Sequence, residues 1–195
     1  EMNIGFALIG TDLELTDGNG TIVADLSPLK ASACDLSIGD TYQGGIIFYL
    51  DASGCHGLIS APTDQSSGIR WHNGSDINTT AFASCVGCGD GNASMIVYSQ
   101  GSGSYAAKLC YDLSLGGYDD WYLPSKYELN LMFHNIGAGN TLGLGNIAGF
   151  SNTSYWSSTE SADYLAWIQL IGINGNTAQA AKSSNFYYVR AIRAF

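Results

Sequence analysis

Residues 124–137 read PSKYELNLMFHNIG, and this stretch predicts a helix together with both of its ends. Ser125 and Glu128 stand three residues apart, which is the spacing of a capping box at a helix N-terminus. The apolar side chains that follow recur at i, i+3, i+4 and i+7 and therefore share one face, which is formed by Leu129, Met132, Phe133 and Ile136. Gly137 is a typical residue at a helix C-terminus. We expect Ser125 and Glu128 to be structural residues of an amphipathic helix.

Short strands and one further helix are expected around this helix. Residues 104–117, SYAAKLCYDLSLGG, predict a second helix that ends at two glycines. Short apolar runs predict strands, namely GGIIFYL at 44–50, HGLISA at 56–61, SYWSST at 154–159 and YLAWIQLI at 164–171. Residues 62–103, rich in Gly, Ser, Asn and Thr, are expected to form a long loop, and residues 172–186 another. Two helices among short antiparallel strands define an α+β domain.

The first 35 residues differ in character from the rest of the chain. The stretch LELTDGNGTIVADLS at 13–27 places DGNG between two alternating apolar runs, which is the turn chemistry of a β-hairpin. We therefore expect a β-rich segment at 1–35, followed by the main domain at 36–195. No signal peptide is recognisable at the start, so we expect the chain to be part of a longer protein.

The last nine residues, YYVRAIRAF at 187–195, are rich in β-branched and aromatic residues and predict a strand. Neither face of this strand is cleanly polar, so we expect it to be covered on both sides. Arg190 and Arg193 would then need partners, because an unpaired buried charge is costly. The candidate partners are Asp119, Asp120 and Glu160. We expect structural ion pairs here rather than arginines that bind a ligand.

The charge balance narrows the classes of partner. Acidic residues outnumber basic ones by 17 to 7, which gives a formal net charge of −10. Nucleic acid is not expected as a partner, because phosphate binding needs clustered Lys and Arg. The same argument disfavours anionic membranes and sulfated sugars as partners, whereas neutral glycans and protein surfaces remain candidate partners. No apolar run approaches the ~20 residues of a membrane span, so no membrane insertion is expected.

The cysteines and the missing motifs argue against catalysis. Among five cysteines, Cys85 and Cys88 have C-x-x-C spacing, but neither a second such pair nor an H-x-x-x-H partner accompanies them. A local disulfide or free buried thiols are therefore favoured over a zinc site. The chain has no Walker motif, no H-E-x-x-H and no G-x-S-x-G. We expect no catalytic residue, no metal and no cofactor.

Four stretches taken together are similar to a known family. They are GDTYQGGIIFYLD at 39–51, AAKLCYDLSLGGYDDWYLPSKYELNLMF at 106–133, YWSSTE at 155–160 and YVRAIRAF at 188–195. With these stretches, residues 36–195 resemble the C-terminal domain of Legionella collagen-like proteins, also known as DUF1566. The resemblance implies a variant of the C-type-lectin-like fold, related in architecture to formylglycine-generating enzymes. It further implies a binding domain rather than an enzyme.

Residues 1–30 resemble the strand-turn repeats that precede the tips of bacterial and phage fibres. Such segments usually trimerise, so the resemblance implies a homotrimer held through the N-terminal segment. The ligand-binding head would then lie outside the cell, at a cell surface or at the tip of a phage or injection-particle fibre. Its expected ligand is a cell-surface protein or glycan.

The C-terminal part also resembles the variable proteins of diversity-generating retroelements. In those systems template adenines are replaced at random, so an AAC codon becomes many residues but never Trp, Gln, Glu, Lys or Met. The residues that such changes cannot produce would form the fixed framework. They occur as single positions between short runs of residues that the changes can produce, and they are Trp156, Glu160, Trp167, Gln169, Gln179 and Lys182. Together with the capping residues and the two C-terminal arginines, the expected structural residues are Trp121, Ser125, Glu128, Trp156, Glu160, Trp167, Arg190 and Arg193.

The same resemblance places the ligand contacts within residues 161–187, on a strand around 164–171 and the loop after it. The reachable residues there are Ser161, Ala162, Asp163, Tyr164, Leu165, Ile168, Leu170, Ile173, Asn174, Ala178, Ala180, Ala181, Ser183, Ser184, Asn185, Phe186 and Tyr187. Tyr and Phe suit recognition because they bring large contact area at low rotamer entropy. The alternative for the aliphatic members is that they belong to the core, and for Ile171 we favour the core.

Two alternative functions remain open. One is an adhesin of the same fold with a fixed ligand site in the loops of residues 62–103. The other is an enzyme of the formylglycine-generating type, although no pair of copper-binding cysteines can be matched to that active site. Bound copper near Cys85 or Cys88 would support the enzyme.

Overall fold

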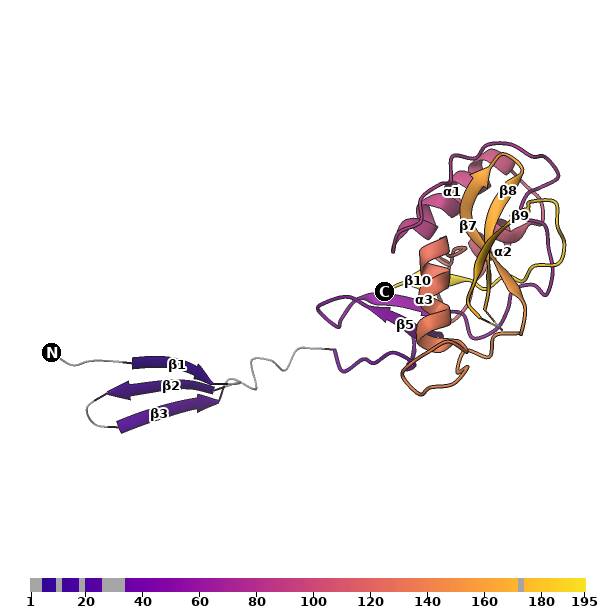
Figure 1. Ribbon diagram of the computed structural model, residues 1–195. Coiled ribbons are helices and arrows are strands. Elements are labelled where there is room, and N and C mark those ends of the chain that lie inside the picture. Colours follow the sequence, from indigo (N-terminus) through magenta and orange to yellow (C-terminus); the bar gives the residue numbers. More distant parts are fainter. Residues whose placement is uncertain (1–4, 10–11, 18–19, 26–33, 172–173) are drawn as a thin grey trace. The chain divides into compact units, whose positions relative to one another are not determined.

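The computed structural model describes residues 5–9, 12–17, 20–25, 34–171 and 174–195, which belong to two compact units (Figure 1). Unit 1 is Glu1–Asp35 and unit 2 is Leu36–Phe195. The described residues form helices and antiparallel sheets, so the predicted α+β class is confirmed. No helix among them is both long and apolar enough to cross a membrane.

Unit 1 contains a three-stranded antiparallel sheet in the order β1-β2-β3. Its strands are β1 (Gly5–Ile9), β2 (Asp12–Asp17) and β3 (Gly20–Asp25). Asp17 pairs with Gly20, which confirms the predicted hairpin, and the two residues between them lie outside the described residues. Ile22 and Val23 of β3 are 68% and 53% exposed, so this sheet leaves apolar side chains uncovered.

The described residues of unit 2 include two antiparallel sheets. The first has the order β10-β6-β5-β4, with β4 (Thr41–Tyr42), β5 (Gly45–Leu50), β6 (Gly57–Ser60) and β10 (Ile192–Ala194). The second has the order β7-β8-β9, with β7 (Ser154–Ala162), β8 (Leu165–Leu170) and β9 (Thr177–Ala181). The four strands predicted from short apolar runs are therefore confirmed.

Strand β9 corrects the prediction of a loop over residues 172–186. Its sequence, TAQAA, has only one β-branched residue and gives little strand signal. It is a strand because β8 offers it a complete edge, with pairs from Leu165↔Ala181 to Gln169↔Thr177. Hydrogen bonds to a neighbouring strand have outweighed local propensity here.

Three helices occur among the described residues, where two were predicted. They are α1 (Cys88–Gln100), α2 (Ala106–Tyr111) and α3 (Lys126–Ile136). Helix α3 confirms the predicted capping box, because Ser125 Oγ accepts the Glu128 N–H at 3.2 Å and the Glu128 carboxylate accepts the Ser125 N–H at 2.7 Å. Helix α2 is shorter than the predicted helix at 104–117.

Helix α1 contradicts the expectation of an uninterrupted loop over residues 62–103. Its sequence, CGDGNASMIVYSQ, contains two glycines and an asparagine, which disfavour a helix locally. The helix instead depends on close packing of small residues. A Cβ on Gly89 would lie 2.4 Å from the Glu128 carboxylate, and the buried Asn92 side chain donates to Ala83 O at 2.7 Å. Tertiary contacts therefore stabilise α1.

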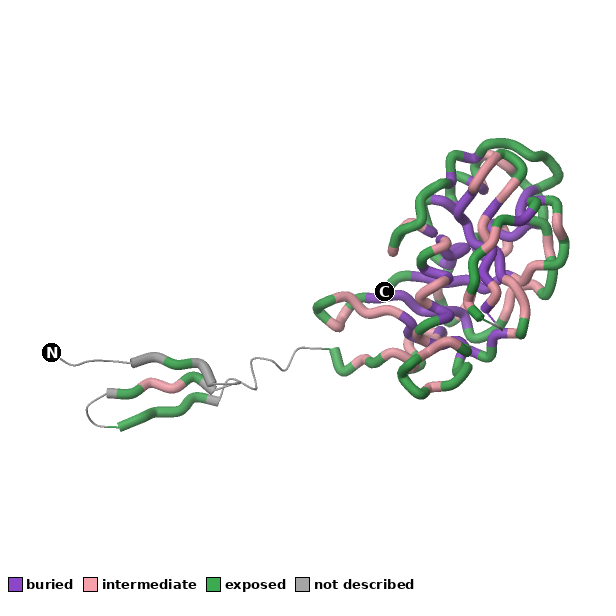
Figure 2. The backbone as a smooth tube through the Cα atoms, viewed as in Figure 1, coloured by how far each residue is buried: buried purple, intermediate pink, exposed green. Residues whose placement is uncertain are grey.

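The hydrophobic core lies in unit 2, where buried segments concentrate in its sheets and helices (Figure 2). It consists of two clusters, one around Trp71, Trp121 and Trp156 and the other around Phe133 and Tyr155. The two clusters together give the unit a core that contains three fully buried tryptophans.

The C-terminal segment runs between both core clusters. Val189 belongs to one cluster and Ile192 to the other, which confirms that this segment is covered on both sides. Only Ile192–Ala194 forms a strand, so the predicted strand at 187–195 is too long. The residues before β10 change partner instead, with single bridges from Tyr188 to Tyr155 and from Val189 to Ser66.

Candidate functional site

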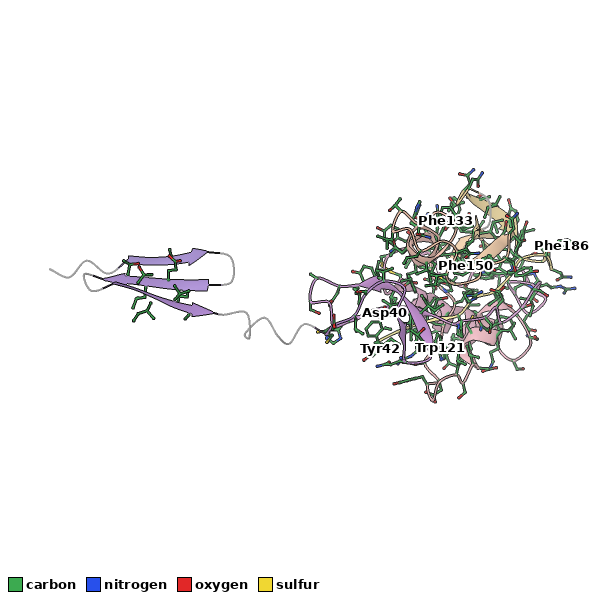
Figure 3. All side chains as sticks on the ribbon, turned by 90° about the horizontal axis from the view of Figure 1, so that it is seen from below. Asp40, Tyr42, Trp121, Phe133, Phe150 and Phe186 are labelled. Carbon is green, nitrogen blue, oxygen red and sulfur yellow. A yellow bond between two sulfur atoms is a disulfide. The ribbon has the colours of Figure 1, made fainter. Side chains whose placement is uncertain are left out.

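Two exposed aromatic side chains lie on the segments next to the paired strands β8 and β9 of unit 2. Tyr164, between β7 and β8, is 59% exposed, and Phe186, after β9, is 80% exposed. Figure 3 shows Phe186 at the periphery of the unit. Aromatic side chains of this kind offer large contact area with few rotatable bonds. We name this region the hairpin surface, and its exposed members are Asp163, Tyr164, Ser183, Asn185 and Phe186.

Lys182 joins the backbone segments that carry the two aromatic residues. Its N–H donates to Tyr164 O at 3.0 Å, and its Nζ donates to Asp163 O at 2.7 Å and to Ile77 O at 3.0 Å. The same Nζ forms an ion pair with Glu160 in which both side chains are fully buried. The turn after β7, the end of β9 and the loop around Ile77 are thereby held together.

Glu160 and Trp71 complete the surroundings of the Lys182 ammonium. The Glu160 carboxylate accepts the N–H and the Oγ1–H of Thr79 at 2.9 and 3.0 Å. Nζ of Lys182 lies 4.4 Å from the Trp71 ring centroid, and the Trp71 N–H donates to Lys182 O at 2.9 Å. Because the remaining polar atoms find partners, the cost of burying the two charges is offset.

The chain that follows β9 lies against a segment from the predicted long loop. Arg70 Nε donates to Asn185 Oδ1 at 3.1 Å, and the Ile69 N–H donates to Tyr187 O at 3.3 Å. The Tyr187 ring packs edge-on against Trp156, with 4.8 Å between the ring centroids. Phe186 therefore projects from a backbone that is held on both sides of it.

A hollow of about 320 Å³ lies where these two segments meet. Its lining consists of Gly68, Ile69, Arg70, His72, Asn73, Gly74, Ser104 and Asn185. His72 is buried there; its Nδ1 accepts the Gly74 N–H at 2.7 Å and its Nε2 lies 3.2 Å from Asp76 Oδ1. The hollow combines residues of the 62–103 region with Asn185, so the two alternative binding regions of the sequence are neighbours in space.

The predicted ligand-contact residues fall into three groups by burial. The exposed ones are Asp163, Tyr164, Asn174, Ala181, Ser183, Asn185 and Phe186. The half-buried ones are Ser161, Ala162, Leu165, Leu170, Ala178, Ser184 and Tyr187. Ile168 and Ala180 are buried, and Ile173 lies outside the described residues.

Ile168 and Ala180 must be removed from the candidate surface. Both lie in a hydrophobic core cluster, and Ala180 pairs with Ala166 on the inward face of the β8–β9 ladder. Side-chain alternation along the strands explains this, because every second residue points to the core. Ile171 is fully buried, which confirms its expected place in the core.

Of the predicted framework residues, Gln169 and Lys182 are buried, but Gln179 is exposed. The eight predicted structural residues are buried with one exception. The buried ones are Trp121, Ser125, Glu128, Trp156, Glu160, Arg190 and Arg193. Trp167 is half-buried, and Lys126 Nζ lies 3.3 Å from its ring centroid. Burial raises the pKa of Glu128, although the N–H groups of Ser125 and Gly87 partly offset this by donating to its carboxylate.

Both C-terminal arginines form the expected ion pairs, but only one has a predicted partner. Arg193 binds Asp120 through two hydrogen bonds of 2.6 and 2.9 Å, as predicted. Arg190 binds Asp64, with Nη2 2.7 Å and Nε 2.8 Å from Oδ1. Glu160 is taken by Lys182 instead.

Several residues of this site could not have been found by sequence reasoning. Arg70 contacts Asn185 across 115 residues, and Asp64 contacts Arg190 across 126. Neither Arg70 nor Asp64 lies in a motif, and the His72 side chain contacts only the nearby Gly74 N–H and Asp76 carboxylate. The presence of Arg70 and His72 in a long polar segment was the single available signal.

The two cysteines of the C-x-x-C motif form a disulfide, Cys85–Cys88, which confirms the first of the favoured alternatives. Cys110 is a free, buried thiol, and burial raises its pKa. No group of three or more His, Cys, Asp or Glu side chains within the described ranges is arranged to hold a metal ion.

Comparison with known proteins gives one family. A family model described as the Lcl C-terminal domain matches residues 61–193. That range contains α1, α2, α3, the β7-β8-β9 sheet and the hollow beside Asn185. No curated protein matches the chain.

Proposed function

Because the chain belongs to the Lcl C-terminal domain family, that of Legionella collagen-like proteins, we propose that it is a non-enzymatic binding domain. Its unit 2 is a variant of the C-type-lectin-like fold. The ligand is a cell-surface protein or glycan, and the hairpin surface together with the adjoining hollow forms the contact region. The chain acts outside the cell, at a cell surface or at a fibre tip.

The observation that carries this proposal is the contrast between exposed aromatics and a rigid base. Tyr164 and Phe186 are 59% and 80% exposed, although burial of either ring would be favourable. Lys182 beneath them is fully buried and bonded to three separate segments. A preformed aromatic surface loses little entropy on binding. This favours recognition over a purely structural role.

The polar residues beside the aromatics fit the same purpose. Asn185 and Arg70 supply donors and acceptors at the hollow, and sugar hydroxyls or peptide groups can pair with such side chains. The formal net charge of −10 favours neutral or basic ligands over polyanions. The same charge supports the absence of a nucleic-acid partner in this proposal.

Diversification of the hairpin surface is the second part of the proposal. Of the residues that adenine-directed changes cannot produce, Trp156, Glu160, Gln169 and Lys182 are buried, Trp167 is half-buried and Gln179 is exposed. Of the residues that such changes can produce, Tyr164 and Phe186 are exposed, whereas Ile168 and Ala180 are buried. This distribution suits a fixed framework that carries a changeable surface. Sequencing the neighbouring DNA tests it: a reverse-transcriptase gene and a near-copy of the C-terminal coding segment that differs at adenines are expected. The absence of both contradicts diversification and leaves the binding proposal intact.

Trimerisation through unit 1 is the third part. Ile22 on β3 and Leu13 on β2, which is 38% exposed, leave apolar surface open on one face of the sheet, because Leu13 pairs with Ala24, two residues from Ile22. Val23 is exposed on the other face. Two further copies of the same sheet would cover this surface and carry three heads side by side. The Cys85–Cys88 disulfide suits an oxidising, extracellular location.

The binding test compares matched alanine variants of the full chain. The labelled protein is applied to an array of neutral and acidic glycans and to a panel of purified cell-surface proteins. Tyr164→Ala and Phe186→Ala should each weaken the strongest binding signal by roughly tenfold or more, as for central aromatic contacts. Tyr98→Ala is the control, because Tyr98 is 91% exposed on α1 and outside the hairpin surface. Equal losses in all three variants would contradict the proposed site.

A fixed site in the 62–103 region is the second candidate, and the hollow favours it. Arg70, His72 and Asn73 all line that hollow. This alternative would be favoured if Arg70→Ala and Asn73→Ala abolish binding while Tyr164→Ala has no effect. The enzyme alternative would need copper near Cys85 or Cys88, whose thiols are joined in a disulfide.

A further inference from the structure

Unit 2 has a second hollow, which no residue of the hairpin surface lines. Its volume is about 420 Å³, and its walls come from α1, the end of α2, the segment before α3 and β10. Three carboxylates line it, those of Asp90, Asp119 and Asp120. The site is therefore separate from the proposed binding surface, and its chemistry differs.

The carboxylates of this hollow are only partly neutralised. Asp120 is bound by the Arg193 guanidinium, and this hydrogen-bonded pair lowers the pKa of the Asp120 carboxyl. Asp90 and Asp119 form no ion pair with any described residue. Two uncompensated negative charges therefore face the same hollow and attract a cation.

Tyr122 places a hydroxyl group without a partner among the described residues at this hollow. The residue is 4% exposed and its ring packs in a core cluster, yet its side chain also lines the hollow. Its hydroxyl makes no hydrogen bond to any described residue. The hydroxyl oxygen is not among the fully enclosed polar atoms that lack a partner, so its lone pairs are open to the hollow and can meet a group that enters it.

The surroundings of the Tyr122 hydroxyl keep it neutral. Burial, followed by the charges of Glu128, Asp90 and Asp120, raises its pKa. The hydroxyl oxygen therefore retains its proton and offers lone pairs that can accept an N–H. The half-exposed Tyr111 ring also lines the hollow and presents an aromatic face, which attracts cations.

We propose that this hollow binds the ammonium group of a small organic amine. Asp90 and Asp119 accept two of the ammonium N–H bonds, and the Tyr122 hydroxyl accepts the third. A metal ion fits less well, because the described residues include no group of three or more carboxylate, His or Cys ligands in metal-binding geometry. The amine comes either from a free diamine or from a lysine side chain, and both present the same group.

Calorimetric titration of the full chain with cadaverine tests the inference, and 1,5-pentanediol is the uncharged counterpart. Cadaverine should bind at least roughly tenfold more tightly than the diol, and its affinity should fall with added salt. Tyr122→Phe and Asp119→Asn should each weaken cadaverine binding by about fivefold or more. Neither change removes a contact of the folded protein, so both variants should fold. Asp35→Asn is the charge-matched control, because Asp35 does not line the hollow.

The inference is overturned when the diol binds as tightly as cadaverine, or when Tyr122→Phe has unchanged affinity. It is also overturned when Asp35→Asn weakens binding as much as Asp119→Asn, because the attraction is then a general effect of the net charge. A second titration uses N-acetyl-lysine methylamide. Tight binding of this probe points to a lysine side chain as the natural source, and binding of cadaverine alone points to a free diamine. Tyr164 and Phe186 variants should leave both titrations unchanged.

Discussion

Lys182 Nζ and Glu160 form an ion pair that is fully removed from solvent, at the base of the surface that carries Tyr164 and Phe186. The pair joins the end of β7 to the end of β9, which are neighbours of β8 on opposite sides. The pair matters because Lys182 also bonds to the backbone of Asp163 and Tyr164, the turn from which one of the exposed aromatics projects. If the exposed side chains vary between proteins, the fold beneath them must be stabilised by residues that do not vary, such as Glu160 and Lys182.

Breaking this pair should strongly destabilise unit 2. Lys182→Met leaves the Glu160 carboxylate buried without its counter-ion, and Glu160→Gln does the same to the ammonium. Each variant should lose about 3–5 kcal/mol of the free energy of unfolding, measured by urea denaturation. Lys108→Met is the control, because the Lys108–Asp112 pair is partly exposed and should lose less than about 1 kcal/mol. Similar losses in both pairs would contradict a structural role for the buried one.

The Asp120–Arg193 pair predicts a change of stability in acid. Hydrogen bonding to Arg193 holds the pKa of Asp120 below its ordinary value in the folded chain. The pair therefore contributes stability above the unfolded-state pKa, and this contribution is lost as the pH falls through the folded-state pKa. Asp120→Asn should be less stable than the parent chain at pH 6, and this difference should be smaller at pH 2. Urea denaturation at both pH values measures this, and a constant difference would contradict it.

The Cys110 thiol should be unreactive in the folded protein. It is completely buried, and burial raises its pKa, so little thiolate forms at neutral pH. A thiol reagent such as iodoacetamide should label Cys110 only after unfolding in guanidinium chloride, as read by peptide mass spectrometry. Labelling within minutes under native conditions would show that α2, which carries Cys110, opens readily.

Unit 1 should determine the oligomeric state. Light scattering should give a trimer for the full chain and a monomer for residues 36–195, because the exposed apolar residues of β3 are then absent. Ile22→Ser with Val23→Ser in the full chain is a matched variant that should also shift the chain towards the monomer. A monomeric full chain contradicts the shaft proposal, whereas a trimer of residues 36–195 moves the interface to unit 2.

Local sequence signals were sufficient for α3 and insufficient for α1. The capping box of Ser125 and Glu128 and the apolar face after it act within one helix, so they can be recognised without tertiary information. Helix α1 buries Gly89 and Ala93, whose small side chains give almost no hydrophobic period. Its stability depends on the neighbouring elements, and a loop was therefore the wrong expectation.

In the candidate site, too, sequence signals were sufficient for some features and insufficient for others. The candidate residues between 161 and 187 could be selected from the family resemblance, but their burial could not be predicted from it. Tyr164 and Phe186 are exposed, whereas Ile168 and Ala180 lie in the core, because β8 and β9 pair in a register that turns the latter inward. The hollow beside Asn185 needs Arg70, which lies 115 residues away.

The sequence by itself determined the α+β class, the capped helix at 126–136, the hairpin at 12–25 and the family, because each depends on short-range patterns. It also determined that Arg190 and Arg193 needed acidic partners. Only the tertiary structure decided that Asp64 and Asp120 are those partners and that Glu160 belongs to Lys182. Local patterns report which groups must be satisfied on burial, but chain segments far apart in the sequence supply the atoms that satisfy them.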